Sequence, residues 1–274
     1  ECLARGRDET AELYRPDFAG MKSILIHIGT HKTGTTSIQQ FLVRASDQLR
    51  EDDILYPEAG RPDDLAPHGH HKVAWSIQER QGLENLEGWE ELVSEVRRSS
   101  CSRILLSSEV FETCSPSEIR QIQSFFQNSE VKALVYLRKP FEYMISLYKQ
   151  HIKSWGEVRA LREFAYSKIH LLDYSYLIDR WCQGLRSGEV IARSFEVCKS
   201  KGLEKSILEV VSAGKKVQKM AEKNSISNIS LREDQAAAVR CMNRLQDHFW
   251  LGMLEGPNLF EDRSITHRIK RQVI

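Results

Sequence analysis

The sequence SILIHIGTHKTGTT, residues 23–36, joins an apolar run to a glycine-rich segment. The apolar run at 23–28 is rich in β-branched residues, which is typical of a strand buried inside a sheet. After the glycine-rich segment at 29–36, apolar residues recur at the spacing of an amphipathic helix, at Ile38, Phe41, Leu42 and Ala45. A strand, a glycine loop and a helix in this order predict the opening unit of a nucleotide-binding α/β fold.

Strand and helix patterns alternate along the rest of the chain. Strands are expected at 103–107, 131–137 and 189–193, with a short one within 54–57. Helices are expected near 72–80, 86–98, 115–127, 140–153, 174–184, 203–211 and 231–249. This alternation predicts an α/β fold with three layers (α/β/α), in which helices cover both faces of a central parallel sheet, as in P-loop nucleotide hydrolases.

The length of 274 residues suits one large α/β domain, which we expect over residues 21–274. Residues 1–20 are polar and carry no hydrophobic pattern. We therefore expect them to be an N-terminal extension outside the folded domain, either disordered or not native to the protein.

Net charge, apolar runs and cysteine spacing argue against several classes of function. The 39 basic and 38 acidic residues give a net charge of +1, whereas a nucleic-acid binder usually carries a larger basic excess. No run of about 18 apolar residues is present, so no membrane span is expected. The six cysteines show no CxxC spacing, which argues against a zinc or thiol redox centre. Since the N-terminus has no apolar signal core, the expected location is cytoplasmic.

The glycine-rich segment resembles a nucleotide phosphate loop with one departure. Gly29 and Gly34 have the spacing of GxxxxGK[ST], and Thr36 holds the Ser/Thr position. Thr35 stands where a nucleoside triphosphatase has lysine, and the lysine of this loop is Lys32, inside the turn. Backbone N–H groups and the helix dipole at such a loop bind an anion. An internal lysine suits a donor that ends in sulfate, because one cation can stabilise the leaving charge without a metal.

A second anion-binding pair is expected after the strand at 131–137. Arg138 follows this strand and therefore lies at the carboxyl edge of the sheet, the edge at which the phosphate loop begins. Ser146 lies eight residues further on, in the next expected helix. A guanidinium group and a hydroxyl can bind one phosphate together, although either residue alone could be an ordinary surface residue.

These segments resemble the two cofactor motifs of the sulfotransferase family. The resemblance lies in IHIGTHKTGTTSIQQFL at 26–42 and VYLRKPFEYMISLY at 135–148, and it extends more weakly over 22–250. It implies a donor, 3′-phosphoadenosine-5′-phosphosulfate, whose product is adenosine 3′,5′-bisphosphate, and no required metal. It places the 5′-phosphosulfate on Thr30, His31, Lys32, Thr33, Gly34, Thr35 and Thr36.

The same resemblance places the 3′-phosphate on Arg138 and Ser146. Lys139 departs from the Asp or Asn that often precedes the proline in the second motif, which weakens that match. The loop is more similar to bacterial and carbohydrate-directed members than to those acting on phenols or steroids. The implied acceptor is therefore the hydroxyl or amine of a glycan or glycoconjugate, and the oligomeric state is not implied.

Transfer to a hydroxyl also needs a base, and several residues are candidates. Glu109 follows the expected strand at 103–107, which places it at the carboxyl edge of the sheet, and Ser108 could orient it. His31 lies inside the loop itself. The loop at 60–71 carries three further imidazoles that are suited to neutral pH, at His68, His70 and His71. No acidic or cysteine partner completes a metal site with these three. The sequence leaves the choice of base open.

Two other functions remain open on the sequence alone. A metal-dependent P-loop kinase for a nucleotide or a sugar would share the strand, loop and helix, but Thr35 and the lack of an acidic metal partner argue against it. A non-catalytic nucleotide-binding domain would keep the anion site without the chemistry. Magnesium-independent binding of adenosine 3′,5′-bisphosphate separates the kinase from the other two.

Overall fold

The computed structural model describes residues 21–63, 66–79, 86–222 and 233–254, and the chain forms two compact units. The first holds the chain up to Leu137 and again from Tyr174, and the second holds Arg138–Asp173 together with the last helix. The expected extension at 1–20 lies outside the described residues, and one domain over 21–274 stays a prediction.

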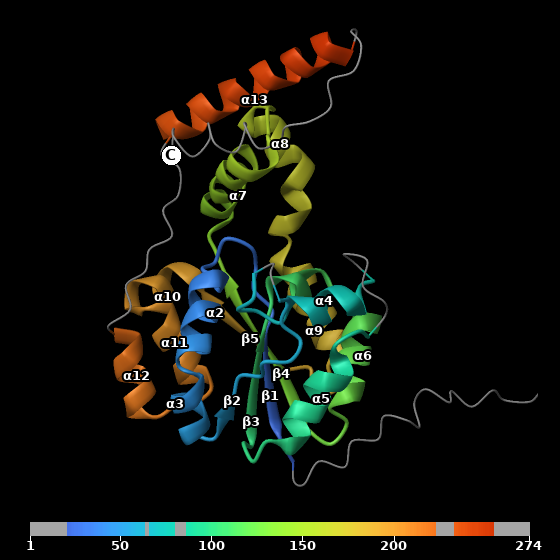
Figure 1. Cartoon of the computed structure of the whole chain (residues 1–274), viewed down its shortest axis with the longest axis vertical. Coiled ribbons are helices and arrows are strands. Elements are labelled where there is room, and N and C mark those ends of the chain that lie inside the picture. Colours follow the sequence, from blue (N-terminus) through green and yellow to red (C-terminus); the bar gives the residue numbers. More distant parts are fainter. Residues whose placement is uncertain (1–20, 64–65, 80–85, 223–232, 255–274) are drawn as a thin grey trace, which may run out of the picture. The chain divides into compact units, whose positions relative to one another are not determined.

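The first unit is built on a five-stranded parallel sheet with the order β2-β3-β1-β4-β5 (Figure 1). Its strands are β1 (Ser23–His27), β2 (Ile54–Leu55), β3 (Arg103–Ser107), β4 (Glu130–Leu137) and β5 (Val190–Ser194). Four of them begin and end within one residue of the expected bounds, and β2 ends two residues earlier than expected. The predicted α/β class with a central parallel sheet is confirmed.

Helices cover both faces of this sheet, as predicted (Figure 1). One face carries α2 (Thr35–Arg44), α3 (Ser46–Glu51), α10 (Phe195–Lys201), α11 (Leu203–Val210) and α12 (Lys215–Glu222). The other carries α4 (His71–Ile77), α5 (Trp89–Arg98), α6 (Pro116–Phe125) and α9 (Tyr174–Gly184). The short helix η1 (Glu109–Thr113) follows β3.

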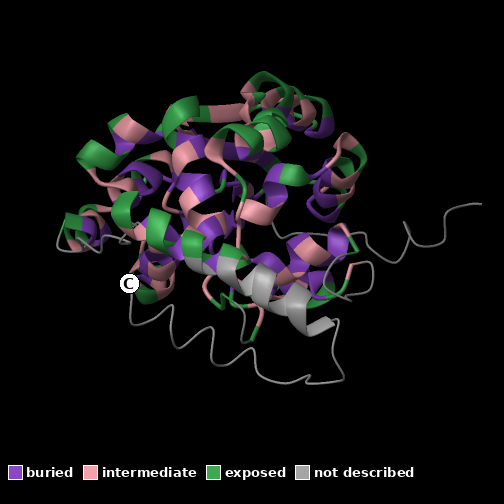
Figure 2. Ribbon diagram, turned by 90° about the horizontal axis from the view of Figure 1, so that it is seen from above, coloured by how far each residue is buried: buried purple, intermediate pink, exposed green. Residues whose placement is uncertain are grey.

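Alternation of side chains along each strand divides the core of this unit into two clusters. Ile24 and Ile26 of β1 pack in the cluster under α5, α6 and α9, whereas Leu25 between them packs in the cluster under α2, α10 and α11. Successive residues of a strand point to opposite faces of the sheet, so a strand buried on both faces is apolar throughout. Buried residues accordingly concentrate in the interior in Figure 2, with exposed residues on the outer sides of helices.

Helix boundaries follow from capping where the sequence supplies it. Ser115 and Glu118 form a capping box ahead of α6, with Pro116 in the first turn, which confirms the expected start of that helix. The helix expected at 72–80 begins at His71 and ends at Ile77. The sequence analysis did not predict α3, α8, α10 and α12, all of eight residues or fewer, because such short helices depend on packing more than on their own pattern.

The second unit is helical. It contains α7 (Pro140–Trp155), α8 (Leu161–Lys168), the short helix η2 (Ile169–Leu172) and α13 (Glu233–Leu254). Its buried cluster joins residues of α7, α8 and α13, namely Tyr143, Met144, Leu147, Tyr148, Ile152, Phe164, Ala236 and Val239. The Tyr148 hydroxyl donates to the Arg159 carbonyl at 2.7 Å and accepts from Arg240 at 2.9 Å. Across the described part of the chain, no helix combines the length and apolar character needed to span a membrane.

Candidate functional site

The loop between β1 and α2 has the backbone of a tight turn around its glycines. Gly29 and Gly34 both have φ of 76°, and Lys32 between them has φ of 66°, in the left-handed region that favours glycine. A Cβ on Gly34 would lie 2.5 Å from Leu203 Cδ1. A Cβ on Gly29 would lie 2.7 Å from the Cα of Glu109. The glycines therefore serve both the turn and the close approach of neighbouring elements.

Two buried threonine hydroxyls hold the loop in place. Thr30 Oγ1 donates to the Tyr136 carbonyl of β4 at 3.1 Å, and Thr33 Oγ1 donates to the Thr30 carbonyl at 2.6 Å. Both side chains are thus engaged inside the protein. Contact of Thr30 or Thr33 with a bound anion would come from their backbone N–H groups.

The start of α2 has the features of an anion site. Gly34 supplies no side-chain cap, and the first turn contains no acidic residue. The first N–H groups of a helix have no partner within the helix, and the dipole there favours negative charge. Thr35 is buried and its hydroxyl has no hydrogen-bond partner in the described part of the chain, while Thr36 is exposed. Together with the half-buried Lys32, these groups form a donor set suited to phosphate or sulfate oxygens.

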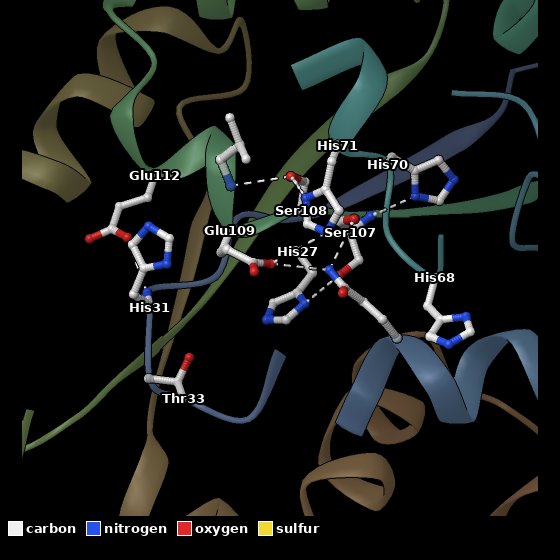
Figure 3. A network of polar contacts seen from close by, with 12 residues as sticks. His27, His31, Thr33, His68, His70, His71, Ser107, Ser108, Glu109 and Glu112 are labelled. Atoms are coloured by element: carbon white, nitrogen blue, oxygen red, sulfur yellow. Dashed lines mark hydrogen bonds and ion pairs between the residues drawn. The ribbon is translucent and has the colours of Figure 1, made fainter. Parts of the chain in front are cut away.

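A buried carboxyl contacts the loop at His31. The His31 backbone N–H donates to Glu112 Oε2 at 3.1 Å, while the His31 side chain is exposed. Burial raises the pKa of Glu112, and the nearby His31 opposes this rise. Arg180 of α9 donates to the carbonyls of Glu112 and Cys114, both at 2.8 Å, and so fixes η1. Figure 3 shows His31 and Glu112 facing one another.

Glu109 lies next to the loop, as its place after β3 predicts. It begins η1, and its side chain is 22% exposed. Its Oε2 atom accepts a hydrogen bond from Gln39 Nε2 of α2 at 3.3 Å and lies 3.9 Å from His71 Nε2 of α4 (Figure 3). The structure thus brings together the glycine-rich loop and the first candidate for the base.

The remaining histidine candidates have distinct surroundings. His70 is fully buried, its Nδ1 accepts the Ser107 N–H at 3.1 Å, and its Nε2 donates to the Pro57 carbonyl at 3.1 Å. This leaves no ring nitrogen of His70 to accept a proton, and burial lowers its pKa to about 3. His68 is half-buried, and its backbone carbonyl accepts the Tyr56 hydroxyl at 2.7 Å.

Three buried polar residues at this edge were missed by the sequence analysis. His27 ends β1 with its Nδ1 2.9 Å from Ser107 Oγ at the end of β3, and Gln39 Nε2 donates to Ser107 Oγ at 3.3 Å. Burial lowers the pKa of His27 to about 3. The available signals were a histidine inside an otherwise apolar run at 23–28 and a glutamine beside the apolar face of the following helix.

Arg138 and Ser146 belong to the second compact unit. Arg138 is half-buried and precedes α7 by two residues, and Ser146 is a buried residue of α7. Their binding of a 3′-phosphate stays a prediction. Among the residues that the structure describes, no group of three or more His, Cys, Asp or Glu side chains is arranged to hold a metal ion.

Comparisons with known proteins complete the description of the site. No protein-family model matches the sequence, and no curated protein sequence matches it. Among solved structures, the chain is similar to a sulfotransferase from Alicyclobacillus acidocaldarius, with 12% identity over 84% of this chain and 96% of that one, and a TM-score of 0.48. It is also similar to a sulfotransferase domain from the curacin biosynthetic pathway, with 11% identity over 84% and 98% of the two chains, and a TM-score of 0.39. At these identities and TM-scores neither likeness assigns a function, so the function of this chain is inferred from its own residues.

Proposed function

We propose that this protein transfers a sulfuryl group from 3′-phosphoadenosine-5′-phosphosulfate to a hydroxyl or amine. The observation that carries the proposal is the loop ahead of α2, which combines an uncapped helix N-terminus with a lysine inside the turn and a carboxylate beside it. Lys32 and Glu109 supply the two charges that the reaction needs, a cation for the leaving group and a base for the acceptor.

The donor set of the loop fits the 5′-phosphosulfate. No side chain of the described residues caps the backbone N–H groups at the start of α2, and the buried hydroxyl of Thr35 has no hydrogen-bond partner among those residues. A lysine within the turn, rather than directly before Thr36, suits an anion whose terminal group carries less charge than a γ-phosphate. A metal ion is not part of this proposal, because the cation at Lys32 serves the leaving group.

The chemistry is an in-line displacement at sulfur. The acceptor oxygen or nitrogen forms a bond to sulfur while the bond from sulfur to the bridging phosphate oxygen breaks, and adenosine 3′,5′-bisphosphate leaves. Lys32 stabilises the negative charge that develops on the departing phosphate. Glu109 removes the proton of the acceptor as the new bond forms.

Two further parts of the proposal rest on the sequence resemblance. Arg138 and Ser146 bind the 3′-phosphate, which distinguishes this donor from ATP. The acceptor is a glycan or glycoconjugate, in keeping with the carbohydrate-directed character of the loop sequence. His31 stays a secondary candidate for the base, because its exposed ring lies on the loop itself.

Calorimetric titration of adenosine 3′,5′-bisphosphate against wild type, Lys32→Ala and Arg138→Ala tests the donor site. Binding to wild type that does not need magnesium, and that weakens at least tenfold in each variant, is the expected result. Arg97→Ala and Arg98→Ala each remove an exposed cation from the last turn of α5 and should bind like wild type. Failure of wild type to bind, beside a magnesium-dependent response to ATP, would favour the kinase instead.

A further inference from the structure

The carboxylate of Glu109 is approached by side chains from two different helices. Gln39 of α2 donates to Oε2 at 3.3 Å, and the Nε2 atom of His71, the first residue of α4, lies 3.9 Å from the same oxygen. Both neighbours are buried, Gln39 with 2% and the His71 side chain with 4% of their surface exposed. Buried polar side chains cost free energy unless they are satisfied, so their convergence on one carboxylate needs an explanation.

The ring of His71 is fixed by its other nitrogen. His71 Nδ1 lies 2.8 Å from Ser108 Oγ, and this hydroxyl oxygen already accepts the Val110 N–H at 3.1 Å. The Glu109 carboxylate on the other side of the ring favours the neutral tautomer with its proton on Nε2, and in that tautomer Nδ1 accepts the Ser108 hydroxyl hydrogen. The N–H of Nε2 then faces the Glu109 carboxylate (Figure 3). The ring of His71 also stacks on Trp75, with the ring centroids 5.6 Å apart.

A glycine makes room for this arrangement. A Cβ on Gly69 would lie 2.5 Å from Gln39 Nε2 and 2.7 Å from His71 Nε2. Gly69 does not have a positive φ, so the space beside these two side chains, and not the turn, is what requires glycine here. The backbone before α4 is thus shaped around the two groups that face Glu109.

The surroundings favour the uncharged form of His71. Burial lowers the pKa of His71, while Glu109 opposes the shift and the His31 ring adds to it. The other ionisable groups with electrostatic contact to Glu109 are Glu112 of η1 and the Tyr56 hydroxyl. A neutral donor can orient a carboxylate without competing with it for the proton of the acceptor.

We propose that His71 and Gln39 are positioning residues that hold Glu109 as the base of the transfer reaction, with Ser108 fixing the ring of His71. This inference rests on the proposed function, because it assigns a role to the neighbours of the proposed base. His71 and Gln39 contact neither the acceptor nor the sulfur in this account, and they act through the direction and ionisation of the Glu109 carboxylate.

The test compares the pH profile of kcat/KM for His71→Leu, Gln39→Leu and His71→Gln, all in the full chain. The two leucine variants should lose about 10- to 100-fold in kcat, as is typical when a group that orients a reacting residue is removed. The acidic limb of their pH profiles should move to higher pH, because an N–H group directed at a carboxylate stabilises its charged form and each variant lacks one such group. His71→Gln keeps a neutral N–H near the carboxylate. It should recover part of the activity, and the pH of its acidic limb should lie close to that of wild type.

His70→Gln is the matched control, because His70 is equally buried but bonds to the Ser107 and Pro57 backbone instead of Glu109. It should lower the melting temperature and leave the acidic limb at the wild-type pH. If Glu109→Gln is inactive and both leucine variants keep the acidic limb of kcat/KM at the wild-type pH, the positioning role is overturned. Full activity of Glu109→Gln would instead refute the base, and absence of bisphosphate binding to wild type would refute the donor site.

Discussion

A Cβ atom on Gly29 would lie 2.7 Å from both Cα and Cβ of Glu109, so the first residue of the glycine-rich loop packs against the backbone of the proposed base. This contact joins the carboxyl ends of β1 and β3, which pair with His27 opposite Ser107. Ligands of open parallel sheets bind at this edge. The sheet therefore places the glycine-rich loop and the Glu109 carboxylate side by side.

Gly29→Ala should disrupt this contact and weaken bisphosphate binding. Gly156→Ala is the matched control, since Gly156 has a similar φ of 71° but has no atom within 4 Å of an added Cβ. The control isolates the cost of a left-handed alanine, roughly 1–2 kcal/mol. Chemical denaturation should show a loss for Gly29→Ala larger than that for the control by more than about 1 kcal/mol. Equal losses would mean that the close approach to Glu109 adds nothing.

Glu109→Gln should separate catalysis from binding. Removing a general base costs about 100- to 10,000-fold in turnover, while the isosteric amide leaves the donor site in place. Turnover of a labelled sulfate donor and calorimetric binding of adenosine 3′,5′-bisphosphate are the two measurements. Glu91→Gln, on the first turn of α5, serves as the control and should match wild type in both. Unchanged turnover in Glu109→Gln would transfer the role of base to His31.

Glu112→Gln should change how stability depends on pH. Because burial raises the pKa of Glu112, the folded protein binds this proton more tightly than the unfolded chain does. The wild type therefore loses stability as pH rises from the unfolded pKa through the folded one. The variant has no such loss and can still accept the His31 N–H. Urea denaturation at several pH values measures the free energy of unfolding of both proteins. Relative to wild type, the value for the variant should increase from about pH 4 upward, and a difference that does not change with pH would contradict the raised pKa of Glu112.

His27→Asn should flatten the acid side of the stability curve. Burial lowers the pKa of His27 from 6.5 to about 3, so the unfolded chain takes up a proton between these values and the folded protein does not. The stability that His27 contributes is complete above pH 6.5 and falls by about 1.4 kcal/mol per pH unit well below it. Asparagine can keep a hydrogen bond to Ser107 and does not titrate. Denaturation between pH 4 and 7 should give a shallower slope for the variant, and parallel curves would show that His27 is protonated in the folded protein.

The opening strand, loop and helix could be predicted because their signals are local. The β-branched run at 23–28 predicts a buried strand, and the glycines at 29 and 34 predict a tight turn. Neither prediction depends on the rest of the chain. Glu109 was placed correctly beside the loop for a topological reason, since parallel strands end at one edge of their sheet.

The environment of Glu109 could not be predicted in the same way. Gln39 and His71 come from separate helices and meet the carboxylate only after these helices have packed on the sheet. Gly69 looked like an ordinary loop glycine, whereas the structure shows that the space beside two side chains requires it. His70 was indistinguishable from His71 in the sequence, and only their hydrogen-bond partners separate a structural ring from one facing the site.

The most direct test of the central claim is a comparison of ligands on the wild-type protein. Adenosine 3′,5′-bisphosphate and adenosine 5′-phosphate would be titrated in the presence of a chelator, and ATP in the presence of magnesium. The account predicts that the bisphosphate binds without metal and at least tenfold more tightly than the monophosphate, because a second phosphate is recognised. Preference for ATP with magnesium, or no difference between the two adenosine phosphates, would contradict a sulfate-donor site.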